Sequence, residues 1–110
     1  MRGEHSLLEI TELREAGRVR VRLRGELDLA TAPTLAERLG ELRKRRKDVL
    51  LDLDELDFID MSGLRVALLA AQESARDGWA FSATPGSPAV RRLIELVHPD
   101  GALPLDGRAP

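Results

Sequence analysis

Apolar and basic residues alternate strictly at positions 18–24, RVRVRLR. In an extended strand successive side chains point to opposite faces, so the apolar residues share one face and the arginines share the other. The preceding segment at 6–13, SLLEITEL, is rich enough in Leu and Ile to pair with this strand, and Glu15 to Gly17 supply a turn. The sequence therefore predicts an N-terminal β-hairpin with one buried face and one wet face.

A helix is predicted from Thr31, where the apolar spacing changes to that of a helical face. Pro33 is tolerated there because the first turn of a helix needs no backbone N–H from it. The face that should be buried carries leucines at i, i+4 and i+7, namely Leu35, Leu39 and Leu42. The basic run RKRRK at 43–47 is expected to form the last turn of this helix.

The segment VLLDL at 49–53 is a short and nearly continuous apolar run. This pattern is typical of a central strand that is covered on both faces. A loop around Leu56, Phe58 and Ile59 is expected to follow it.

A second helix is expected to begin at Ser62 or Gly63 and to end at Gly78. Its buried stripe should contain Leu64, Ala67, Leu68, Ala71 and Ala75. Its opposite face should carry Arg65, Leu69, Gln72, Glu73 and Arg76. Leu69 is the one apolar residue on that outward face.

The last part of the chain predicts a strand, a helix and a short strand. Trp79 to Thr84 has the composition of a strand, and Ser87 followed by Pro88 forms an N-cap and first-turn pair that opens a third helix. The buried face of this helix should carry Val90, Leu93, Ile94 and Val97. The helix is expected to end at 98–99, and ALPL at 102–105 can add a short strand.

Strands and helices alternate after the initial hairpin, which favours a largely parallel α/β sheet. A single domain spanning 1–110 is expected, because 110 residues can build one packed core and are too few for two. The predicted fold class is α/β, with a four- or five-stranded, mostly parallel but mixed sheet and with helices packed on one face.

Composition narrows the class of protein. Apolar residues make up 43% of the chain and charged residues 33%, as in an ordinary soluble globular protein. There are no cysteines, and His5 and His98 have no ligand-like spacing, so we expect no metal and no cofactor. No stretch approaches the length needed to cross a bilayer, so we expect a cytoplasmic protein without membrane contact.

The most informative segment is DFIDMSGLRVALLA at 57–70, where an acidic loop leads straight into a helix N-terminus. Here Asp60, Met61, Ser62 and Gly63 resemble the signature of the STAS domain of bacterial anti-sigma factor antagonists. That signature is an aspartate, a variable residue, a serine or threonine, and a glycine. The resemblance extends over 7–99 and includes three further matches in the right order: GELD at 25–28, VLLDLDELDFID at 49–60 and SPAVRRLIEL at 87–96.

The resemblance implies a STAS fold and a phosphorylation switch at Ser62. In that family the serine or threonine is phosphorylated by the anti-sigma factor, which is itself a serine kinase, and a separate phosphatase reverses the modification. The unphosphorylated protein occupies the kinase and so releases a sigma factor, with no catalytic activity of its own. This chain departs from the family in two ways: Met61 stands where many members have a small polar residue, and we expect the family's C-terminal helix to be absent.

The position of Ser62 at a helix N-terminus has its own physical consequence. Orphan backbone N–H groups and the positive dipole end favour an anion there, so the fold would tolerate a phosphate. The phosphate would add about −1.5 to −2 charges beside Asp60, and a partner surface fitted to the neutral serine would meet repulsion. The simpler alternative is that Ser62 only caps the helix, because serine is a favoured N-cap residue.

Residues around the motif complete the expected partner-binding set. Leu69, near Arg65 and Ser62, is a candidate apolar anchor. Asp28 matches an acidic position at the edge of the family's partner-binding surface, while its plainer role is to end a strand and cap a turn. The full expected set is Asp28, Asp60, Met61, Ser62, Gly63, Arg65 and Leu69.

Three other classes of protein share some of these sequence features. An enzyme is disfavoured, because no G-x-S-x-G elbow and no G-x-x-x-x-G-K-S/T loop occurs. A nucleic-acid-binding module is suggested by the basic residues at 18–24 and 43–47, but the acidic loop at 52–60 and the scarcity of aromatic residues argue against it. An unphosphorylated STAS scaffold of a stress-sensing complex, or an accessory subunit of a lipid transporter, stays open because Ser62 alone does not exclude either.

Overall fold

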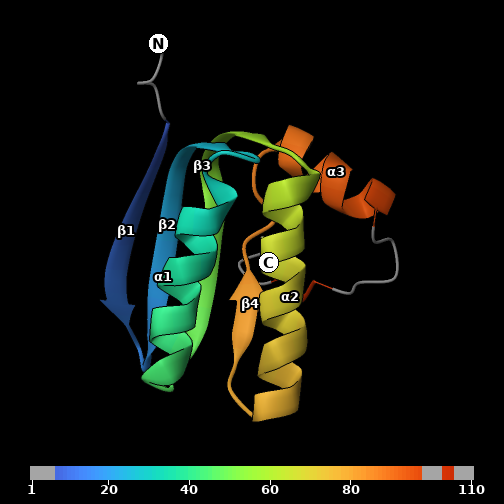
Figure 1. Cartoon of the computed structure of the whole chain (residues 1–110). Coiled ribbons are helices and arrows are strands. Elements are labelled where there is room, and N and C mark those ends of the chain that lie inside the picture. The colour runs from blue at the N-terminus through green and yellow to red at the C-terminus, as the bar shows by residue number, and fades with distance from the viewer. Residues whose placement is uncertain (1–6, 98–102, 106–110) are drawn as a thin grey trace.

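The computed structural model describes residues 7–97 and 103–105 (Figure 1). Within them the chain forms a four-stranded sheet in the order β1-β2-β3-β4, together with three helices. The elements in chain order are β1 (Leu8–Glu15), β2 (Arg18–Leu27), α1 (Ala32–Lys44), β3 (Val49–Ile59), α2 (Met61–Asp77), β4 (Phe81–Ala83) and α3 (Pro88–Val97). The predicted α/β class is therefore confirmed.

The predicted N-terminal hairpin is present. β1 and β2 pair antiparallel from Leu8 opposite Gly25 to Glu15 opposite Arg18. The two residues of the turn, Ala16 and Gly17, both have positive φ values, of 24° and 85°. A two-residue hairpin turn of this kind matches the right-handed twist of the strands that it joins.

The remaining strands pair parallel, β2 with β3 and β3 with β4, so the sheet is mixed as predicted. The central position of β3 is confirmed, since all five residues of 49–53 are buried. The expected loop after this run is wrong, because β3 continues to Ile59. Its second half pairs with β2 through two irregularities in register and ends where Leu27 lies opposite Ile59.

Helices α1 and α2 lie side by side on one face of the sheet, and both run from the same end of the molecule to the other (Figure 1). The three leucines predicted for the buried face of α1 are buried. In α2 the buried face is rotated from the predicted one: Ala70 and Ser74 are buried, Leu68 is half-buried and Ala75 is exposed. Gly63, on the first turn, is also buried and lies close to Leu27.

The basic run at 43–47 does not form the last turn of α1. The helix ends at Lys44, and Arg46 adopts the left-handed conformation with a φ of 57°. The N–H of Lys47 donates to the carbonyl of Leu42 at 3.1 Å, and the N–H of Arg46 donates to that of Arg43 at 2.9 Å. This is a Schellman arrangement, so the last three basic residues of the run leave the helix in a defined turn.

The C-terminal elements follow the prediction in outline. β4 is three residues long and thus shorter than expected, whereas α3 begins at Pro88 with the N–H of Val90 donating to Ser87 Oγ at 3.3 Å. Val90 and Ile94 are buried in α3, and the other two residues predicted for its buried face are half-buried. The expected last strand is represented by one parallel bridge between Ala83 and Leu105. Ala102 and the predicted helix end at His98 and Pro99 lie outside the described residues.

Candidate functional site

The ends of β2 and β3 meet at one edge of the sheet, where both α1 and α2 begin (Figure 1). Leu27 pairs with Ile59, and the N–H of Asp60 donates to the carbonyl of Leu27 at 3.1 Å. Asp28 and Asp60 directly follow these paired residues. The topology therefore brings the loop before α1 against the first turn of α2.

Asp60 caps α2. Its Oδ1 accepts the backbone N–H of Ser62 at 2.9 Å and that of Gly63 at 3.2 Å, and its carbonyl accepts the N–H of Leu64 at 3.0 Å. The helix begins at Met61, so the predicted start at Ser62 or Gly63 is wrong. Serine and glycine are both favoured at N-caps, and so is aspartate. The backbone of Asp60 is extended, and its side chain reaches the N–H groups of Ser62 and Gly63.

Ser62 is therefore the second residue of α2 and not its N-cap. Its side chain is half-buried, and its hydroxyl forms no hydrogen bond with any of the residues that the structure describes. The simpler alternative, that the serine serves only as a cap, is excluded by the geometry of Asp60.

Gly63 serves the packing of the fold. A Cβ built on Gly63 would lie 2.4 Å from Leu27 Cγ and 2.9 Å from the Leu27 carbonyl oxygen. Contacts this short do not occur between real atoms, so any larger residue would push α2 away from β2. Gly63 is buried, and the first turn of α2 lies directly against Leu27 at the end of β2.

The plainer role of Asp28 is visible in the structure. Its Oδ1 accepts the N–H of Ala30 at 3.0 Å and that of Thr31 at 3.1 Å. Its own N–H donates to Thr31 Oγ1 at 2.9 Å. Asp28 thus closes the turn between β2 and α1, and it remains half-buried at the edge of the site.

Met61, Arg65 and Leu69 follow one another at intervals of four along the outward face of α2, which places them in a row. Met61 is 40% exposed and Leu69 is 52% exposed, and Arg65 has no ion pair with the described residues. The predicted exposure of Leu69 is confirmed. An apolar row with one free cation is suited to contact another protein.

Leu29 is a further exposed apolar residue that the sequence patterns did not indicate. It follows Asp28, is 76% exposed and lies in the loop before α1. Little in the sequence indicates its exposure, because Leu29 lies in GELDLAT at 25–31 and belongs to no periodic apolar face. We define the Ser62 surface as Asp28, Leu29, Asp60, Met61, Ser62, Arg65 and Leu69.

The arginines at 18–24 of β2 do not form a free basic surface. Asp52 of β3 accepts hydrogen bonds from Arg20 at 2.9 Å and from Arg22 at 3.4 Å, and Glu55 accepts one from Arg24 at 3.2 Å. Burial by itself would raise the pKa of Asp52, but the backbone N–H of Asp54 and the guanidinium groups outweigh it and lower the pKa. These pairs neutralise much of the charge that suggested nucleic-acid binding.

Two classes of site are not found in the part of the chain that the structure describes. No group of three acidic or histidine side chains there is arranged to hold a metal ion. No helix there has both the length and the apolar character needed to span a membrane.

Comparisons with known proteins agree with this architecture. The family model described as "Mlab, STAS domain" matches residues 10–105. The anti-sigma F factor antagonist of Paenibacillus polymyxa is 32% identical over 91 residues, which cover 81% of this chain and 78% of that protein. A Bordetella bronchiseptica protein described as anti-sigma factor antagonist BtrV is 35% identical over 75 residues, or 67% of this chain and 65% of that protein.

A solved structure shows the same fold. The crystal structure of an anti-sigma factor antagonist from Mycobacterium paratuberculosis matches with a TM-score of 0.82 and 24% identity. The match covers 93% of this chain and 87% of that one. The four strands and three helices described above are thus arranged as in that protein.

Proposed function

Because this chain belongs to the STAS domain family, among relatives named anti-sigma factor antagonists, we propose that it is a phosphorylation-switched antagonist of an anti-sigma factor. Unphosphorylated, it binds an anti-sigma factor that is a serine kinase and so releases a sigma factor. The kinase phosphorylates Ser62 and ends the binding, and a phosphatase restores it. The protein acts in the cytoplasm by binding, and ATP is used by the kinase.

The observation that carries the proposal is the unoccupied hydroxyl of Ser62 at the second position of α2. Asp60 already caps the helix, so the fold does not require this hydroxyl. Met61 and Leu69 supply exposed apolar contacts on the same helix, which a protein partner can cover.

The charge of a phosphate on Ser62 would not be compensated by the first turn of α2. The N–H groups of Ser62 and Gly63 already donate to Asp60 Oδ1, so they are not free to donate hydrogen bonds to the phosphate. Of the nearby groups, Arg65 lies three residues along the helix, within reach of a phosphate on Ser62. The modification would therefore change what the partner meets, by adding charge and by engaging Arg65, while leaving α2 folded.

The first experiment is intact-mass spectrometry of the protein after incubation with the host's candidate anti-sigma kinase and ATP. One added phosphate is expected on the wild type and on the control variant Ser82→Ala, and none on Ser62→Ala. A phosphate that persists on Ser62→Ala would place the modification elsewhere.

The second experiment measures affinity for the same kinase by calorimetry. Ser62→Ala should bind as the unmodified wild type does, because the hydroxyl has no partner within the fold. Ser62→Asp should bind at least about tenfold more weakly, because a charge is then desolvated at the interface. Equal affinity of the two variants would refute the switch, and absence of any phosphate with an active kinase would favour the unphosphorylated STAS scaffold or accessory subunit.

A further inference from the structure

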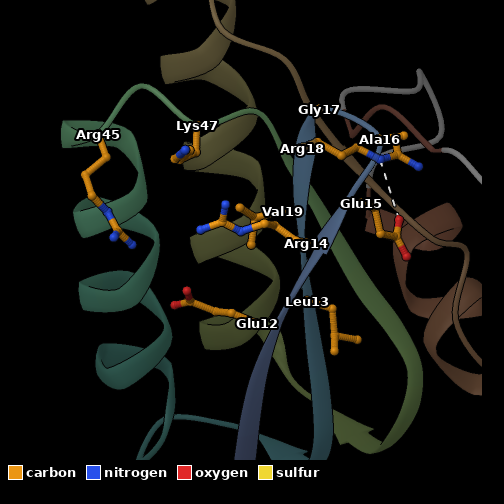
Figure 2. Close-up of a pocket in the computed structure, with 10 residues that line it drawn as sticks. All are labelled: Glu12, Leu13, Arg14, Glu15, Ala16, Gly17, Arg18, Val19, Arg45 and Lys47. Atoms are coloured by element: carbon orange, nitrogen blue, oxygen red, sulfur yellow. Dashed lines mark ion pairs between the residues drawn. The ribbon is translucent and has the colours of Figure 1, made fainter.

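The end of the molecule opposite Ser62 contains a hollow of about 540 Å³, between the β1–β2 turn and the loop that follows α1. Figure 2 shows Arg14 of β1 and Lys47 of the loop on the side of the hairpin that faces α1, with Arg45 beside them at the end of that helix. Residues far apart in the sequence thus bring three cations to one wall.

The carboxylates of this hollow are already paired. Glu12 accepts from Arg38 of α1 at 3.4 Å, and Glu15 forms ion pairs with Arg20 and Arg18. Arg14, Arg45 and Lys47 have no ion pair with the described residues. The wall that they form therefore carries positive charge that the described part of the fold does not neutralise.

A second hollow at this end of the molecule is lined by a cation that is paired within the fold. There Arg43, in the last turn of α1, contacts Asp77 of α2 at 2.8 Å and Glu73 at 3.6 Å. Arg43 also lies where its charge offsets the helix dipole. Arg45 and Lys47 lie past the helix end, and the Schellman turn fixes the direction in which they leave it.

We propose that this hollow binds a compact anion with two or more phosphate groups, the chemistry of a pyrophosphate or tripolyphosphate moiety. Guanidinium forks bind phosphate oxygens in pairs, and a lysine adds a point charge, so Arg14, Arg45 and Lys47 are matched to such a group. A cavity of this volume accommodates a small molecule. No aromatic side chain lines it, so the phosphates are the part that is recognised.

The test is calorimetric titration of the full chain with inorganic tripolyphosphate at about 0.15 M salt, where exposed charges beyond about 8 Å are screened. Saturable one-site binding is expected. Arg14→Gln and Arg45→Gln should each weaken it about tenfold, since each removes one charged donor pair. Arg91→Gln on the exposed side of α3 is the matched control and should bind as the wild type does.

Three results would overturn the proposal. The first is the absence of saturable binding to the wild type. The second is an equal loss in Arg91→Gln, which would indicate attraction to net charge alone. The third is tighter binding of a short DNA duplex with the same dependence on Arg14, which would assign the cations to nucleic acid. Lys47→Gln provides an independent variant, and unchanged thermal unfolding of each variant shows that the fold is retained.

Discussion

Helices α1 and α2 begin side by side, and an aspartate before each of them is followed closely by a hydroxyl residue. Before α1, Asp28 and Thr31 bond to one another, and Thr31 Oγ1 donates to the carbonyl of Glu26 at 2.8 Å. At α2, Asp60 alone caps the helix, and the Ser62 hydroxyl has no partner among the described residues. The comparison teaches that two similar local sequences can give one hydroxyl a structural role and leave the other without one.

The largest effect is expected from the contact between the first turn of α2 and the end of β2. Gly63→Ala should lower the free energy of unfolding by about 1–3 kcal/mol, because the new methyl group overlaps Leu27. Gly40→Ala in α1 is the matched control, since a Cβ there meets no atom within 4 Å, and it should raise stability by about 1 kcal/mol. Urea denaturation measures both, and a loss of the same size in the two variants would contradict the packing role of Gly63.

A smaller effect is expected at the cap of α2. Asp60→Ala should cost about 1–2 kcal/mol, because two N–H groups of the first turn lose their acceptor. Asp60→Asn should retain most of that stability, since asparagine caps nearly as well. Thermal unfolding followed by circular dichroism measures the difference, and an unchanged Asp60→Ala variant would mean that Ser62 can take over the cap.

The comparison itself is tested by removing each hydroxyl. Thr31→Ala should lower the free energy of unfolding by at least about 1 kcal/mol, because the Thr31 hydroxyl accepts the N–H of Asp28 and donates to the carbonyl of Glu26. Ser62→Ala should change it by less than about 0.5 kcal/mol. If both variants lose the same stability in chemical denaturation, the two helix starts are equivalent and the argument from the free hydroxyl is wrong.

The smallest change in stability is expected at Leu69. Leu69→Ala should alter the free energy of unfolding by less than about 0.5 kcal/mol, because the side chain is 52% exposed, yet it should weaken binding to the partner kinase about tenfold. Leu96→Ala on α3 is the control, because that leucine is 74% exposed and lies outside the Ser62 surface. A large loss of stability in Leu69→Ala would show that the residue belongs to the core.

Local patterns predicted most of the fold. The alternation at 18–24, the leucine spacing of α1 and the apolar run at 49–53 each reflect a periodicity that the chain itself contains. The second half of β3 could not be predicted in this way, because its acidic residues are typical of a loop. Glu55 is tolerated in this part of the strand because it meets Arg24 of β2 across the sheet, and that pairing depends on the register of two distant segments.

The sequence motif indicated where the candidate site lies, but it did not indicate the local geometry there. The motif located Ser62, but the choice of Asp60 as the cap depends on which oxygen reaches the N–H groups of the first turn, and composition does not specify that. Leu29 belongs to no periodic face and was missed. The wall formed by Arg14, Arg45 and Lys47 exists only once the hairpin lies against the end of α1.

The strand order leaves β1 and β4 at the two margins of the sheet, and this arrangement bears on how the protein behaves at high concentration. β1 carries Glu9, Glu12 and Arg14, while β4 has three residues and a bridge to Leu105. Charged side chains and short length both discourage strand-to-strand association between molecules. Glu12 and Arg14, which line the hollow, thus also oppose aggregation. Replacing them with β-branched residues would create a strand edge that pairs readily with other molecules.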